Sequence, residues 1–194
     1  MAGYIMEYNI PNLLTSFRIV LVPVVVVFFY LPVYWGEQVA AAVFMVAAIT
    51  DLFDGYLARK WGQTSAFGAF LDPVADKVIV SVALILLVDK NPTDYPSIFM
   101  TLAAIIIIGR EITISALREW MAEIGSRNSV AVSIIGKVKT TTQMTALVWL
   151  LYGQPLFGFH LVEAGFVLLY IAVFLTLWSM IDYISAALVS MKND

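Results

Sequence analysis

Near its C-terminal end the sequence reads Leu161-Val-Glu-Ala-Gly-Phe-Val-Leu-Leu-Tyr-Ile-Ala-Val-Phe-Leu-Thr-Leu-Trp-Ser-Met-Ile-Asp-Tyr-Ile-Ser-Ala-Ala-Leu-Val189, where only Glu163 and Asp182 are charged. A helix needs about 20 mostly apolar residues to cross a bilayer, so this run predicts a membrane-spanning helix. Five shorter apolar runs precede it, and the six together cover residues 13–34, 39–57, 69–88, 97–121, 130–152 and 161–189. We therefore expect an all-α protein, a polytopic membrane bundle of six transmembrane helices. It would form a single domain over residues 1–194, with a short interfacial segment around residues 4–11.

The composition of the whole chain also indicates a membrane protein. Of its 194 residues 61% are hydrophobic and 13% are charged, and the mean hydropathy is +0.90. A soluble domain is about 45–50% apolar and about 25% charged, so the excess apolar surface is expected to face lipid. The net charge of −3 argues against a nucleic-acid partner, and the absence of cysteine excludes disulfides and thiolate metal sites.

The basic residues predict how the helices are oriented in the membrane. With six crossings and the N-terminus inside, ten of them fall at or near cytoplasmic helix ends, and Lys90 alone is left on the far side. An excess of Lys and Arg marks the cytoplasmic side of membrane proteins, so both termini are expected to be cytoplasmic. The ten are Arg18, Arg59, Lys60, Lys77, Arg110, Arg118, Arg127, Lys137, Lys139 and Lys192.

Two acidic residues share one face of the second predicted helix. Asp51, Asp54, Gly55 and Ala58 follow the steps i, i+3, i+4 and i+7, which place side chains on the same helix face. Ionisable groups inside membrane helices are costly and usually face a protein interior or an aqueous cavity for a functional reason. Arg59, one turn beyond the glycine, presents a planar fork of donors that suits a phosphate.

The third predicted helix carries a matching acidic stripe, because Gly68, Asp72 and Asp76 step by four residues. The short connection to the preceding helix predicts antiparallel neighbours whose two carboxylate pairs face each other. Four carboxylates held together cannot all stay ionised without counter-charge. Protonation would relieve the repulsion, and so would divalent cations that prefer hard oxygen ligands, Mg²⁺ or Mn²⁺. Taken singly, each aspartate would more often be a helix cap and each glycine a packing residue.

A group of basic residues lies on the fourth and fifth predicted helices. Arg110 and Arg118 are about two turns apart on one helix, and Lys137 and Lys139 begin the next. One interpretation is that they bind a phosphate group. The alternative is that they form structural ion pairs, for which the available acids are Glu111, Glu119 and Glu123.

The acidic segment also resembles a known signature. It reads Asp51-Leu-Phe-Asp54-Gly55-Tyr-Leu-Ala58-Arg59, then eight residues, then Gly68-Ala-Phe-Leu-Asp72-Pro-Val-Ala-Asp76. This resembles the CDP-alcohol phosphatidyltransferases at every signature position. Four further segments resemble bacterial members of that family that use glycerol 3-phosphate: Asn12-Leu-Leu-Thr15-Ser-Phe-Arg18, Gly109-Arg110-Glu111-Ile112, Ser115-Ala-Leu-Arg118-Glu119-Trp120 and Gly136-Lys137-Val-Lys139-Thr140.

The resemblance implies a role for each of these residues. Two divalent cations, Mg²⁺ or Mn²⁺, would be bound by Asp51, Asp54, Asp72 and Asp76. Asp76 would also be the general base. CDP-diacylglycerol would contact Thr15, Gly55, Ala58, Arg59, Ser65 and Gly68. The phosphate of glycerol 3-phosphate would contact Arg110, Arg118, Lys137 and Lys139.

The resemblance further implies a reaction and a cellular location. The phosphatidyl group of CDP-diacylglycerol would pass to the sn-1 hydroxyl of glycerol 3-phosphate, releasing CMP and leaving phosphatidylglycerophosphate for the synthesis of phosphatidylglycerol and cardiolipin. The enzyme would be a homodimer in the bacterial inner membrane, with its active site facing the cytoplasm.

Three other functions are compatible with parts of the sequence. A sister enzyme of the same family would carry the same acidic signature and use another alcohol. An ion-coupled transporter also needs intramembrane acids, although here the acids cluster at one membrane face and the chain shows no internal repeat. A polytopic prenyltransferase also binds Mg²⁺ through aspartates, but its acidic motifs lie on helices far apart in the sequence.

Overall fold

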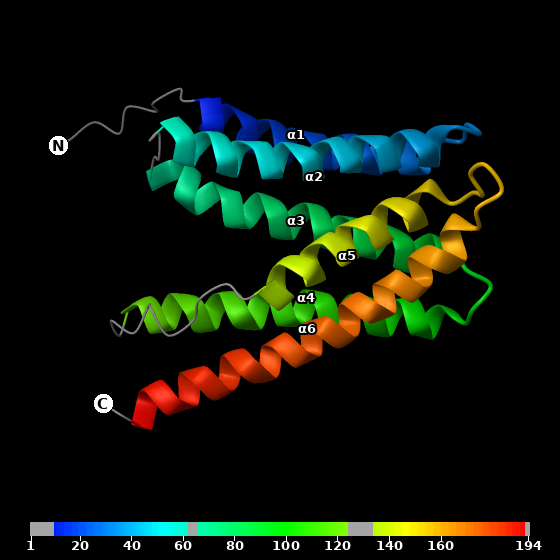
Figure 1. Ribbon diagram of the computed structural model, residues 1–194. Coiled ribbons are helices and arrows are strands. Elements are labelled where there is room, and N and C mark those ends of the chain that lie inside the picture. Colours follow the sequence, from blue (N-terminus) through cyan, green and yellow to red (C-terminus); the bar gives the residue numbers. More distant parts are fainter. Residues whose placement is uncertain (1–9, 62–65, 124–133, 193–194) are drawn as a thin grey trace. The chain divides into compact units, whose positions relative to one another are not determined.

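A computed structural model describes the backbone of residues 10–61, 66–123 and 134–192, and the side chains of residues 13–51, 71–121 and 136–185. The described residues form six α-helices and no strand (Figure 1). The helices are α1 (Ile10–Tyr30), α2 (Gly36–Trp61), α3 (Ala66–Lys90), α4 (Ser97–Glu123), α5 (Ile134–Tyr152) and α6 (Leu161–Lys192). The expected all-helical fold is confirmed, and each helix boundary lies within four residues of the predicted one.

The chain divides into two compact units. The first contains residues up to Leu86 together with Leu151–Gly153, and so comprises α1, α2 and most of α3. In this unit α1 packs along α2 (Figure 1). Its buried apolar side chains include Val25 and Phe29 on α1 and Phe44 on α2, each at most 3% exposed.

A tight turn after α1 brings α2 back beside it. The helix ends at Tyr30 rather than at the predicted residue 34, because Pro32 disfavours the helical conformation of the residue before it. At Gly36, where α2 begins, an added Cβ atom would lie 2.6 Å from the carbonyl oxygen of Phe28. The turn therefore requires glycine at this position.

The second unit contains α4, most of α5, and α6. Within it α4 packs against α6, and α5 approaches α6 closely at Gly165. A Cβ atom on Gly165 would lie 3.1 Å from the side chain of Leu150 and 3.3 Å from the carbonyl oxygen of Ala146. Small residues allow membrane helices to pack closely in this way.

Three of the helices in the described part of the chain are long and apolar enough to cross a membrane. The spans are Leu13–Tyr30 in α1, Ser97–Met121 in α4 and Leu161–Ser185 in α6. Each also exposes large apolar side chains to its surroundings, among them Val20, Ile105 and Phe174, which are 60%, 62% and 61% exposed. These surfaces are suited to hydrocarbon, and the chain is a membrane protein.

Pro73 lies inside α3, between the two aspartates of the acidic stripe. The helix begins at Ala66 and continues through the proline to Lys90. Because proline has no backbone N–H, it cannot donate the helical hydrogen bond to the carbonyl group of residue 69. The hydrogen-bond ladder of α3 is therefore interrupted between residues 69 and 73, the turn that contains Asp72.

Candidate active site

The first unit gathers three of the four predicted metal ligands around two side chains of α1. Thr15 and Arg18 lie one turn apart on α1, and each is only 1% exposed. A guanidinium buried so deeply in an apolar helix is costly unless it is paired. Its partners are acidic side chains from α2 and α3.

Arg18 joins the two acidic helices through one of its nitrogen atoms. Its Nη1 lies 3.0 Å from Oδ1 of Asp51 on α2. The same Nη1 donates a hydrogen bond to Oδ1 of Asp76 on α3. Two carboxylates from different helices therefore approach a single positively charged position.

Thr15 holds the third carboxylate. Its Oγ1 donates a hydrogen bond to Oδ1 of Asp72, which lies one turn before Asp76 on α3. The side chains of Asp51 and Asp76 remain 33% and 40% exposed. We call Thr15, Arg18, Asp51, Asp72 and Asp76 the aspartate cluster; its protein cation is buried while its carboxylates stay partly open to solvent.

The aspartate cluster fits the chemistry of a divalent-cation site. Its three carboxylates and one guanidinium carry a net charge of −3 + 1 = −2. Because Asp51 of α2 and Asp76 of α3 both contact Arg18 Nη1, carboxylate oxygens from the two helices can approach one cation together. Carboxylate oxygens are also the donors that Mg²⁺ and Mn²⁺ prefer. Within the described side chains no three acidic or histidine residues form a cluster with metal-site spacing.

Several predicted site residues lie outside the described side chains. The backbones of Asp54, Gly55, Ala58 and Arg59 belong to α2, and that of Gly68 to α3, but their side chains are outside the described set. Ser65 is outside the described residues altogether. The roles expected for these six residues stay predictions.

The second unit contains a basic cluster centred on Glu111 of α4. Glu111 Oε1 accepts a hydrogen bond from Lys139 Nζ of α5 at 2.6 Å. It also accepts one from Arg110 Nη1 at 3.2 Å. The structural alternative raised from the sequence, in which nearby glutamates pair with these cations, is therefore observed for Arg110 and Lys139.

Helix α6 completes the basic cluster with two residues that the sequence analysis did not single out. Ser179 Oγ accepts a hydrogen bond from Arg110 Nη2 at 3.1 Å. The hydroxyl of Tyr183 accepts one from Arg118 Nη2 at 2.7 Å. The two guanidinium carbons lie 5.6 Å and 5.1 Å from the centre of the Tyr183 ring, within the range of cation–π attraction.

The basic cluster holds more positive than negative charge. Arg110, Arg118 and Lys139 contribute three positive charges and Glu111 one negative charge, a net of +3 − 1 = +2. The side chains of Arg110 and Lys139 are 10% and 5% exposed. Lys137, the fourth predicted residue, has an exposed side chain. Nearly enclosed cations in surplus are suited to an anion such as a phosphate.

Sequence signals were present for Arg18, Ser179 and Tyr183, which were not among the predicted site residues; Thr15 was predicted, as a contact of CDP-diacylglycerol. Thr15 and Arg18 are spaced by three residues within an otherwise apolar helix, and Arg18 is the one charged residue of α1. Ser179 and Tyr183 are spaced by four residues in α6. In both helices a pair of polar groups at helical spacing marks the face that turns toward a charged cluster.

Comparison with known proteins identifies the class to which this helical membrane protein with an acidic cluster belongs. A family model described as CDP-alcohol phosphatidyltransferase matches residues 8–178. The chain therefore belongs to the CDP-alcohol phosphatidyltransferase family, and it is a phosphatidyltransferase.

Curated relatives resemble the chain over nearly its whole length. A protein of Escherichia coli (strain K12) is 57% identical over 182 residues, which are 94% of this chain and 96% of the relative. A protein of Salmonella choleraesuis (strain SC-B67) gives the same values. Both relatives are named CDP-diacylglycerol–glycerol-3-phosphate 3-phosphatidyltransferase.

Proposed function

We propose that this protein transfers the phosphatidyl group of CDP-diacylglycerol to the sn-1 hydroxyl of glycerol 3-phosphate, releasing CMP. The observation that carries the proposal is the presence of two opposite surplus charges, −2 in the aspartate cluster and +2 in the basic cluster. A diphosphate donor needs cations around it, and a phosphate-bearing acceptor needs a separate cationic site. The names of the relatives support the same pair of substrates.

The aspartate cluster would hold the divalent cations. Asp51, Asp72 and Asp76 are the described candidates, and Asp54 is the fourth by its place in the signature. When bound, such ions neutralise the diphosphate and the negative charge that develops on the leaving group. Thr15 and Arg18 would keep the carboxylates oriented, Thr15 through Asp72 and Arg18 through Asp51 and Asp76.

Asp76 is the proposed general base. It accepts the proton of the acceptor hydroxyl as that oxygen attacks the β-phosphorus of CDP-diacylglycerol. A new phosphorus–oxygen bond forms, the diphosphate bridge breaks, and CMP leaves with the bonding electrons. The 40% exposure of its side chain supports this role, because a general base must reach the hydroxyl whose proton it accepts.

The basic cluster is the proposed site of the acceptor phosphate. Arg110 and Arg118 offer planar donors on the face of α4 that carries Glu111, and Lys139 adds a third charge from α5. Lys137 would add a fourth from the first turn of α5. Glu111, Ser179 and Tyr183 would hold the cations in place against their mutual repulsion.

We further propose that all six helices cross the membrane as one domain with both termini in the cytoplasm, and that the protein is a homodimer of the bacterial inner membrane. Helices α2, α3 and α5 each carry charged residues of the two clusters: Asp51 on α2, Asp72 and Asp76 on α3, and Lys139 on α5. This arrangement places ionisable residues in a protein interior, where membrane proteins keep them.

An assay of the purified protein with CDP-diacylglycerol and a panel of alcohols tests the function. We expect CMP release with glycerol 3-phosphate and none above background with glycerol, serine or inositol, because those acceptors lack the phosphate. Release should require Mg²⁺ or Mn²⁺ and return when either ion is restored after chelation. Preferred turnover of an acceptor without a phosphate would assign the protein to a sister activity of the family.

A further inference from the structure

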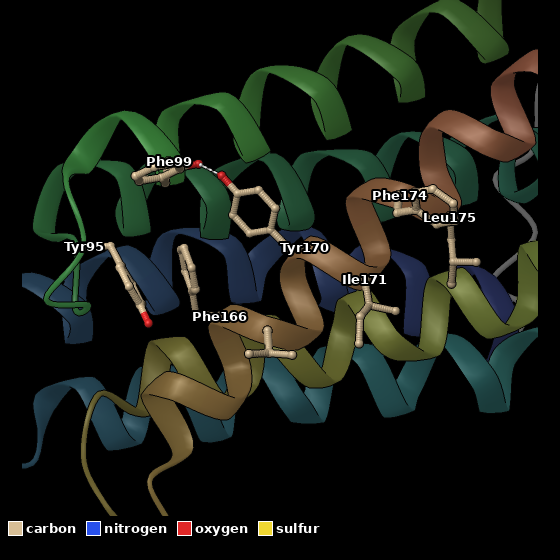
Figure 2. Close-up of a pocket in the computed structure, with 8 residues that line it drawn as sticks. Tyr95, Phe99, Phe166, Tyr170, Ile171, Phe174 and Leu175 are labelled. Atoms are coloured by element: carbon tan, nitrogen blue, oxygen red, sulfur yellow. Dashed lines mark hydrogen bonds between the residues drawn. The ribbon is translucent and has the colours of Figure 1, made fainter.

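An aromatic groove runs along α6 at the end of the second unit where α4 begins (Figure 2). Its volume is about 650 Å³, which lies within the range of about 300–1,000 Å³ that is usual for ligand sites. Tyr95 and Phe99 form one wall, and the side chains of α6 from Phe166 to Leu175 form the other. The groove lies on the two helices α4 and α6, which are both candidate membrane spans, so it is an apolar site bordered by hydrocarbon.

The walls of the groove are held in place by contacts between aromatic rings. Tyr95 stacks on Phe166 with ring centres 4.6 Å apart and an angle of 18° between the planes. The hydroxyl of Tyr170 donates a hydrogen bond to the carbonyl oxygen of Phe99 at 3.0 Å (Figure 2). Because that hydroxyl is bound to the protein, Tyr170 presents its apolar ring to the groove.

The length of the groove matches one acyl chain. Its α6 wall extends from Phe166 to Leu175, nine helical steps of about 1.5 Å each that span about 14 Å. One leaflet of the hydrocarbon core is about 15 Å thick, half of the ~30 Å bilayer core. An acyl chain that enters at Tyr95 and follows α6 would be covered for most of its length.

The mouth of the groove is acidic. A second pocket of about 290 Å³ shares Tyr95 with the groove, and its lining includes Asp94 and Glu163. The described residues that line it include no basic side chain; Lys90, which ends α3, is not among them. An apolar channel with an acidic mouth is complementary to an amphiphile whose headgroup carries a positive charge.

We propose that this groove binds a membrane phospholipid with an ammonium headgroup, one acyl chain lying along α6 and the ammonium group lying beside Asp94 and Glu163. The stacked rings of Tyr95 and Phe166 add a surface to which a cation is attracted. In the orientation proposed above, the lipid belongs to the outer leaflet.

This lipid site is separate from the basic cluster of the same unit. Phe99 lies in the first turn of α4 and Arg110 lies eleven residues further along it, a distance of about 16 Å on the helix axis. An anionic lipid, including the product of the proposed reaction, would meet two carboxylates at the mouth of the groove. The groove is therefore suited to a lipid that the enzyme binds without converting it.

Native mass spectrometry of the purified full chain tests the proposal. The protein is given equal amounts of phosphatidylethanolamine and phosphatidylglycerol with identical acyl chains, and the lipids that stay bound are counted. We expect phosphatidylethanolamine to be retained about fivefold more than phosphatidylglycerol, as two weakly screened ion pairs would produce. Equal retention of the two lipids, or preference for phosphatidylglycerol, would overturn the assignment of the headgroup.

Two variants separate the headgroup from the acyl chain. In the double variant Asp94→Asn with Glu163→Gln we expect the preference to disappear while retention of both lipids continues. In Ile171→Trp the larger side chain takes up space in the groove. Retention of both lipids should then fall at least to the level measured when a competing detergent is present. The matched control is Ile105→Trp, because Ile105 is 62% exposed on α4 and does not line the groove.

The lipid-retention measurements test the groove independently of the proposed transfer reaction. If Ile171→Trp and Ile105→Trp retain lipid equally, the groove is not the binding site and the proposal fails. CMP release by the Asp94→Asn, Glu163→Gln variant is expected to equal that of the unchanged protein, since neither residue belongs to either charged cluster. A protein that releases CMP but shows no lipid preference would refute this inference and leave the proposed function intact.

Discussion

The aspartate cluster of the first unit and the basic cluster of the second have opposite compositions. In the first, three carboxylates share Arg18 as their cation. In the second, Arg110, Arg118 and Lys139 share Glu111 as their acid. Each cluster contains one oppositely charged residue, which ties its helices together but leaves two charges of the majority sign. A cluster that was purely structural would be expected to neutralise itself.

The two clusters also differ in which partner is exposed. In the aspartate cluster the minority charge is buried, with Arg18 at 1%, and the carboxylates of Asp51 and Asp76 are 33% and 40% exposed. In the basic cluster it is the majority cations Arg110 and Lys139 that are enclosed, at 10% and 5%. The first arrangement suits ions and a large donor arriving from solvent, and the second suits a small anion that is surrounded when bound.

The largest expected effect tests the aspartate cluster through its proposed base. Asp76→Asn keeps the size of the side chain and a hydrogen-bonding group for Arg18 but removes the proton acceptor. We expect kcat to fall about 10²–10⁴-fold, the usual contribution of a positioned base, with helix content by circular dichroism unchanged. Asp89→Asn, an exposed carboxylate near the end of the same helix, is the control. Normal turnover by Asp76→Asn would remove the base assignment.

The next effect tests the basic cluster through Arg110. Arg110→Ala removes two of its hydrogen bonds and one charge. A hydrogen bond to a charged group contributes about 1.5–3 kcal/mol, so the KM for glycerol 3-phosphate should rise about 10–100-fold while the KM for CDP-diacylglycerol changes little. Lys90→Ala, at the end of α3, serves as a control for loss of charge alone. If both variants have the same KM for glycerol 3-phosphate, the acceptor phosphate binds elsewhere.

A smaller effect is expected when the net charge of the aspartate cluster is changed. Arg18→Gln takes one positive charge from the aspartate cluster, whose net charge becomes −3. Electrostatic attraction for a divalent cation then increases, and we expect Mn²⁺ measured by electron paramagnetic resonance to bind about tenfold more tightly. The same variant should unfold at a lower temperature in chelator and recover when Mn²⁺ is added. If Arg18→Gln binds Mn²⁺ more weakly than Arg18→Lys does, the guanidinium orients the carboxylates more than it repels the ion.

The smallest effect concerns the residue that α6 contributes to the basic cluster. Tyr183→Phe removes the hydroxyl bonded to Arg118 and keeps the ring below both guanidinium groups. One exposed hydrogen bond contributes about 0.5–1 kcal/mol, so the KM for glycerol 3-phosphate should rise about two- to fivefold with kcat unchanged. Tyr183→Ala, which also loses the ring, should raise it further. Identical values for the two variants would exclude the ring from any role.

The helices were predictable from the sequence because their signal is local. A run such as residues 161–189 contains enough apolar residues for a span, and Gly and Pro residues separate it from the run before. The boundary errors have local causes as well: Pro32 ends α1 early, and the helical spacing around Asp51 continues α2 beyond residue 57 to Trp61. Apolar run length alone measures only part of such a helix.

The partners of the charged residues were less accessible from the sequence. The spacing of Asp72 and Asp76 predicts a shared helix face, and their meeting with α1 depends on contacts between residues 57 and 58 positions apart. Arg110 and Ser179 are 69 positions apart. Helical periodicity fixes which residues share a face, but it contains no information about which neighbouring helix that face meets. That information lies in tertiary packing.

The position of Arg18 near the beginning of the chain has a consequence for biogenesis. A ribosome synthesises α1 before α2 and α3, so Arg18 is made before Asp51, Asp72 and Asp76. An acidic group without a counter-ion is costly in hydrocarbon. The order of residues along the chain thus makes the counter-charge of the aspartate cluster available before its carboxylates.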